Sequence, residues 1–158
     1  MIRNIAPLAV AIAIAAMPIG TPQRDFEPVA TITGHARAVD GDDIAFGRVR
    51  VRLWGIAAPG DGRWLEPGGP EATTALAALI GRAVVTCELT GETAGRSARP
   101  VAQCSVRGRD LAEIMVFAGL VRDCPAHSGQ RYADAERLAK AAGRDLSAIY
   151  DLPDYCLQ

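Results

Sequence analysis

Two stretches decide the fold of this chain: Val39-Asp40-Gly41-Asp42-Asp43-Ile44 and, nine residues after Asp43, Arg52-Leu53-Trp54-Gly55-Ile56-Ala57-Ala58-Pro59-Gly60. The first sets three carboxylates around a glycine, a composition typical of a tight turn. The second continues a segment, residues 48–53, in which arginines alternate with valine and leucine. Because that two-residue period is typical of a half-buried strand, we predict strands at 44–46 and 49–54 around a turn at Gly47.

The same reading extends along the chain and gives an α+β protein. Alternating apolar residues and turn signals predict five strands, at Val29–Val39, Ile44–Phe46, Val49–Trp54, Ala83–Leu89 and Arg99–Val106. Helical periodicity predicts three helices, from Pro70 to Gly81, from Asp110 to Gly119 and from about Gly129 to Ala142. Five strands interrupted and followed by helices suit a five-stranded OB-type barrel.

Composition limits the partners and the compartment. The net charge of −1 offers no global attraction for a polyanion, so any phosphate binding must come from a local arginine cluster. Residues 1–20 have a short positive start and an apolar run, which predict a secretory signal peptide; residues 21–28 read as a polar leader and 29–158 as one domain. We therefore expect a secreted or periplasmic monomer, with no membrane association beyond this signal.

The four cysteines, Cys87, Cys104, Cys124 and Cys156, suggest two disulfides in an exported chain, with three possible connectivities. Facing residues of an antiparallel hairpin have a constant sum of residue numbers, and that rule places Cys87 opposite Cys104. Cys124 and Cys156 then remain to tie the C-terminal tail to the end of the second helix. We expect no zinc site, because there is no C-x-x-C motif and neither histidine fits a ligand pattern.

The chain resembles the staphylococcal-nuclease (thermonuclease-like) family over roughly residues 30–150. That family's pattern reads V-D-G-D-T-[VI], then R-L-x-G-I-D-A-P-E, then R-Y-G-R. The matching segments here begin at Val39, at Arg52 and at Arg96, where the sequence is Arg96-Ser97-Ala98-Arg99. The resemblance implies an OB-type barrel that cleaves nucleic-acid phosphodiesters with Ca²⁺.

Carried over residue by residue, the resemblance makes Asp42 a metal carboxylate and Asp40 its neighbour in the metal shell. Arg52 and Arg99 become the catalytic phosphate clamps, since guanidinium groups bind phosphate through paired charge-assisted hydrogen bonds. Ala57 stands where the family has its second metal carboxylate, and Gly60 stands where it has the glutamate that handles water.

The two missing carboxylates predict weak Ca²⁺ binding and weak or absent hydrolysis, because Ca²⁺ takes about six to eight oxygens and a general base contributes about 10²–10⁴-fold. We expect Ala57→Asp with Gly60→Glu to raise activity, on condition that the surrounding shell survives the two changes. The predicted function is an exported domain that binds nucleotide phosphates or single-stranded nucleic acid. One alternative is an active Ca²⁺-dependent endonuclease with a rewired site using Asp42, Asp43 and Asp61. Another is a non-catalytic protein-interaction module in which the arginines are structural.

Overall fold

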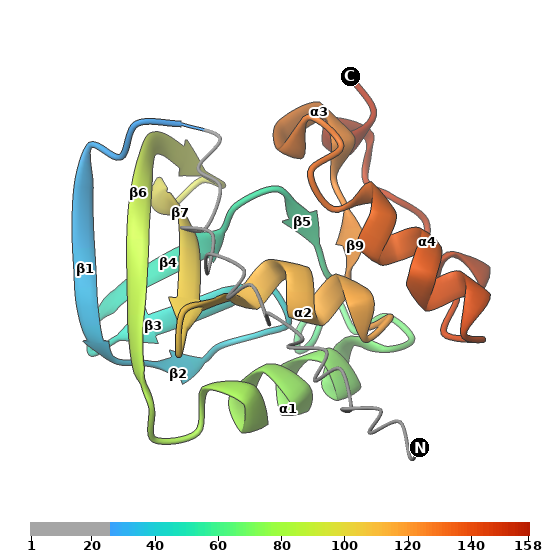
Figure 1. Cartoon of the computed structure of the whole chain (residues 1–158), viewed down its shortest axis with the longest axis horizontal. Coiled ribbons are helices and arrows are strands. Elements are labelled where there is room, and N and C mark those ends of the chain that lie inside the picture. Colours follow the sequence, from blue (N-terminus) through green and yellow to red (C-terminus); the bar gives the residue numbers. More distant parts are fainter. Residues whose placement is uncertain (1–25) are drawn as a thin grey trace, which may run out of the picture.

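The computed structural model describes residues 26–158, so the predicted signal peptide and leader residues 21–25 lie outside the described part. The described residues form an α+β fold in which a curved, mostly antiparallel sheet packs against helices (Figure 1). The α+β prediction is therefore confirmed. No helix among residues 26–158 is long and apolar enough to cross a membrane.

The main sheet has seven strands, and its path runs in the order β1-β6-β7-β4-β3-β2 with β8 attached to β7. A second, two-stranded sheet pairs β5 with β9. All pairings are antiparallel except β4 with β7, which is parallel. Within the described residues the path is open, because β1 and β2 end it without pairing to each other. The strands are β1 Ala30–His35, β2 Arg37–Ala38, β3 Asp43–Phe46, β4 Val49–Leu53, β5 Ile56–Ala57, β6 Val84–Ala94, β7 Arg99–Val106, β8 Arg109–Asp110 and β9 Arg122–Asp123.

Four α-helices are present in the described part: α1 Gly69–Ile80, α2 Leu111–Phe117, α3 Pro125–Ser128 and α4 Ala133–Ala141. Asp110 caps α2 as predicted, since its carboxylate accepts from the Ala112 amide at 2.9 Å. The predicted third helix is wrong at its start. Gly129 and Gln130 have φ of 58° and 68°, and this left-handed backbone ends α3 before α4 begins.

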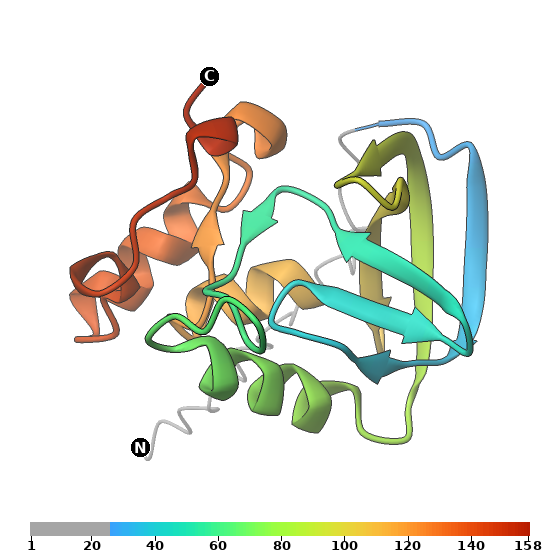
Figure 2. The same ribbon diagram turned by 180° about the vertical axis from the view of Figure 1, so that it is seen from behind.

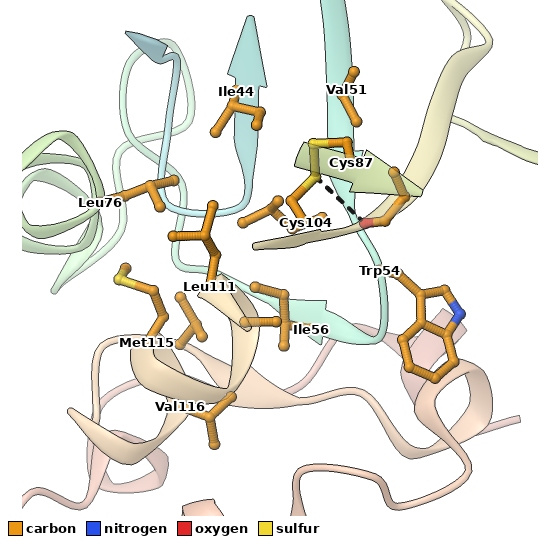
Figure 3. Close-up of a cluster of buried hydrophobic side chains, with 14 of the residues drawn as sticks. Ile44, Val51, Trp54, Ile56, Leu76, Cys87, Cys104, Leu111, Met115 and Val116 are labelled. Carbon is orange, nitrogen blue, oxygen red and sulfur yellow. Dashed lines mark hydrogen bonds between the residues drawn. A yellow bond between two sulfur atoms is a disulfide. The ribbon is translucent and has the colours of Figure 1, made fainter. Parts of the chain in front are cut away.

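The core lies between the strands and the first two helices (Figure 3). Side chains of β3 and β4 meet those of α1 and α2 there, and Ile44, Val51, Leu76 and Leu111 are fully buried. Each such side chain contributes about 1.5–3 kcal/mol by leaving water. This packing fixes β3 and β4, the strands that carry the acidic turn and the arginines.

The β6–β7 hairpin confirms the first disulfide. Cys87 faces Cys104 in the register, and the two are bonded with a Cα–Cα distance of 4.0 Å. The constant-sum rule fails nearer the turn, because a bulge between Leu89 and Thr93 shifts the register before the strands reach Arg99.

A second, smaller core holds the C-terminal tail, a name used here for residues 150–156. The Cys124–Cys156 disulfide lies in this core, as expected, together with Leu146, Tyr150 and the side chain of Ala57 from β5. The tail runs along the side of the molecule that carries β5 and β9, away from β1 (Figure 2).

Candidate anion-binding and metal site

The acidic turn between β2 and β3 is built around a glycine without room for a side chain. A Cβ at Gly41 would lie 2.7 Å from the Cβ atoms of Ala58 and of Ala72 in α1. The Asp40 carboxylate accepts from the Asp42 amide at 3.2 Å, the local bond by which aspartate stabilises turns. The turn is therefore pressed against α1, with its carboxylates held toward β4.

Asp42 forms the centre of the site. Its carboxylate lies 2.6 Å from Nη1 of Arg52 and accepts from the Ala58 amide at 2.8 Å. Burial is the largest influence and raises the pKa of Asp42 to about 7, although the Arg52 charge opposes the rise. Arg52 also donates to the Ile56 carbonyl at 3.0 Å and contacts the Tyr155 hydroxyl at 3.4 Å.

Asp43 pairs with two further arginines, Arg50 and Arg99. Its buried carboxylate contacts Arg50 at 2.8 Å and forms an ion pair with Arg99. Burial raises the pKa of Asp43, the charge of Asp40 raises it further, and the arginines oppose this. Among the described residues, Oδ1 of Asp43 and Nε of Arg99 have no hydrogen-bond partner.

Arg50 belongs to the site but was not among the residues predicted for it, since the alternation of residues 48–53 predicted only a half-buried strand. Its side chain is nearly half exposed, but its guanidinium lies at Asp43 and 3.8 Å from Asp40. The signal was present in the β3–β4 hairpin, because the register that puts Asp43 opposite Arg52 makes Arg50 its diagonal neighbour. Tyr155 was also missed, because nothing in the sequence shows that the tail returns to the site.

The predicted site residues converge on one cleft of about 460 Å³. Asp40 and Asp42 come from the turn, Arg52 from β4 and Arg99 from the start of β7, and all four line this cleft. The parallel β4–β7 pairing brings the two arginines together, since Arg52 lies beside Val101. The charged side chains that line the cleft are three carboxylates and two guanidinium groups, those of Asp40, Asp42, Glu66, Arg52 and Arg99. The cleft therefore has no excess of positive charge.

The three aspartates of the acidic turn and β3 are the residues that could hold a Ca²⁺ ion. Oxygens of Asp40, Asp42 and Asp43 lie within 4.8 Å of one another, and one oxygen of Asp43 is unpaired. Asp42 forms an ion pair with Arg52, and Asp43 forms ion pairs with Arg50 and Arg99. Because Ca²⁺ needs about six to eight oxygens, it would have to displace these arginines from a small donor set. As arranged, the residues do not fit a tight Ca²⁺ site, and Asp61 is not part of this group.

Ala57 and Gly60, which stand where the family pattern has Asp and Glu, lie in tightly packed surroundings. Ala57 is fully buried in the tail's core beside Tyr150 and Cys156. A Cβ at Gly60 would lie 2.0 Å from the Trp64 carbonyl oxygen. Gain of activity in Ala57→Asp with Gly60→Glu therefore requires the chain to shift at Gly60 and a new carboxylate to be buried at position 57. Glu66 occupies the space beside Gly60, accepting from its amide at 2.7 Å, and lines the cleft.

Comparison of the chain with models of known protein families gives no match, and comparison with curated proteins gives none either.

Proposed function

We propose that this chain is an exported thermonuclease-like domain that binds phosphate groups of nucleotides or single-stranded nucleic acid, with weak or absent hydrolysis. The observation that carries the proposal is the convergence of Arg52, Arg99, Asp40 and Asp42 on one cleft. They come from three separate segments of the sequence, and each matches a position of the family pattern. In this proposal the curved sheet corresponds to the family's OB-type barrel.

Three features of the site support weak or absent hydrolysis. Ala57 and Gly60 offer no carboxylate, and the arginines neutralise the aspartates that remain. Ca²⁺ binding is accordingly weak. The two disulfides support export, since such bonds persist in oxidising compartments.

An exposed tryptophan favours nucleic acid over simple anions. Trp64 is 78% exposed and lines the cleft, whereas Trp54 is buried in the core. An exposed indole beside a phosphate site can stack on a base, worth about 1–3 kcal/mol per base.

A binding titration tests the proposal. Thymidine 3′,5′-bisphosphate is titrated into the wild type, Arg52→Ala, Arg99→Ala and, as a control, Arg48→Ala, which is exposed on the same hairpin. We expect modest affinity, a loss of about tenfold per cleft arginine (about 1.4 kcal/mol), and no effect of Arg48→Ala. For a single strand, two phosphate contacts give a log–log salt slope of about −1.4. Binding that is unchanged in both cleft variants would show that the arginines are structural.

A nuclease assay separates the rival functions. We expect no Ca²⁺-stimulated cleavage of denatured DNA relative to EDTA. Robust cleavage that disappears in Asp61→Ala would establish the rewired endonuclease. The self-neutralised arginines favour a second candidate, the non-catalytic interaction module; absence of any nucleotide binding would favour that module.

A further inference from the structure

The C-terminal tail reaches the candidate site and is firmly held there. The Cys124–Cys156 disulfide anchors one end, and the Tyr150 ring is buried beside Ala57. Arg122 donates to the Tyr150 carbonyl at 3.2 Å and is itself fixed by Glu136 at 2.8 Å. The tail is therefore pinned to β9 and α4 and cannot swing away without breaking these contacts.

Tyr155 projects from this tail onto the guanidinium expected to bind phosphate. Its hydroxyl lies 3.4 Å from Nη2 of Arg52, and its ring lies 6.2 Å, centroid to centroid, from that of His127. The Tyr155 hydroxyl therefore occupies a donor of Arg52 that an anion oxygen would otherwise take.

Tyr155 also borders two cavities. One is the 460 Å³ cleft with the acidic turn; the other, of about 410 Å³, lies over Leu53 and Val101. Arg52, Arg99 and Tyr155 line both cavities. A polynucleotide strand that extended from one cavity into the other would pass the border at which Tyr155 lies, whereas each cavity alone falls within the size range of small-ligand pockets.

We propose that Tyr155 sets the ligand preference of the site, favouring a phosphate ester of mononucleotide size over the interior of a continuous strand. This inference rests on the proposed phosphate-binding function. Removal of the ring frees Arg52 and widens the passage at the edge that the two cavities share. Removal of the hydroxyl alone frees Arg52 but keeps the bulk of the ring at that edge.

The test compares two ligands on four proteins. Thymidine 3′,5′-bisphosphate and an oligothymidylate of eight nucleotides are titrated into the wild type, Tyr155→Phe, Tyr155→Ala and Leu157→Ala. Leu157 is a matched control, because it is exposed near the same chain end and lines neither cavity. We expect Tyr155→Ala to raise oligonucleotide affinity about tenfold relative to bisphosphate affinity. Tyr155→Phe should raise bisphosphate affinity about twofold to threefold, and Leu157→Ala should change neither.

A second variant reaches the same state by another route. Cys124→Ser with Cys156→Ser detaches the tail and should reproduce the change in the affinity ratio. Bisphosphate binding with an unchanged ratio in every tail variant would overturn the role of Tyr155 and leave the proposed function standing. Failure of all the proteins to bind either ligand would overturn both. Binding that appears only in Tyr155→Ala would overturn both as stated, because the wild type would then admit neither ligand.

Discussion

At the residue scale, Asp43 accounts for much of the character of this site. In the resemblance its position carries threonine, and the single carboxylate found here pairs with both Arg50 and Arg99. A buried ion pair is weak evidence of net stability, but removal of one partner leaves the other charge stranded.

Asp43→Ala should therefore lower the free energy of unfolding by about 3 kcal/mol. Arg50 is partly solvated, so the stranded charge is mainly that of Arg99. Urea denaturation of the purified protein measures the effect, with Asp61→Asn as a control outside the acidic group. A loss below about 0.5 kcal/mol would mean that the pairs contribute nothing.

Asp42 predicts how stability responds to pH. Its folded pKa of about 7 exceeds the ordinary value of 3.8, mainly because of burial, so the folded state retains a proton that the unfolded state releases. The free energy of unfolding should consequently fall as pH rises from about 4 to 7. One pKa unit corresponds to about 1.4 kcal/mol, so the fall is a few kcal/mol; Asp43, whose pKa is also raised, acts in the same direction.

Urea unfolding in EDTA at several pH values measures this fall. Asp42→Asn removes one titrating group and should flatten the profile. An equally steep profile in Asp42→Asn, or a rise in stability over this range, would contradict the assignment.

At the element scale, the loop between β5 and α1 is closed by Gly60 and Glu66. The Gly60 carbonyl accepts from the Glu66 amide at 2.9 Å, and Glu66 accepts in return from the Gly60 amide. This closed turn leaves no space for a Cβ at Gly60.

Gly60→Ala should lower the free energy of unfolding by about 1–3 kcal/mol, the usual cost of overpacking. Gly34→Ala is the matched control, since its Cβ would meet only Phe46 at an ordinary 3.8 Å. Thermal denaturation distinguishes the two variants, and an equal effect of both would show that the loop simply opens.

Local chemistry made several elements predictable. The alternation of arginines with apolar residues predicted β4, and the capping aspartate Asp110 predicted the start of α2. The constant sum of residue numbers in a hairpin predicted the Cys87–Cys104 disulfide. The bulge in β6 and the break at Gly129 left no unambiguous local signal. The contact of Tyr155 with Arg52 joins residues 103 apart, which no local pattern specifies.

At the scale of the whole molecule, two cores carry one disulfide each. Cys87–Cys104 lies in the main core and Cys124–Cys156 in the core of the tail. Removal of the first disulfide should therefore affect the stability of the whole domain, whereas removal of the second should affect only the region of the tail.

Replacement of Cys87 and Cys104 by alanine should lower global stability by about 3 kcal/mol, as loop-closure entropy for a separation of 17 residues suggests. Replacement of Cys124 and Cys156 should instead expose residues 146–156 and leave β6 and β7 protected. Amide hydrogen exchange resolves the two cases, and identical protection losses would contradict the division into two cores.

The parallel pairing of β4 with β7 has a consequence for the order in which the chain folds. The β3–β4 and β6–β7 hairpins involve neighbours in the chain and can form early, but the pairing of Arg52 with Val101 must close a long loop. Arg52 and Arg99 therefore come together only through a pairing that neither hairpin makes by itself. A ligand that requires both arginines reports that this pairing has formed, and a nascent chain that ends before β7 has no such site.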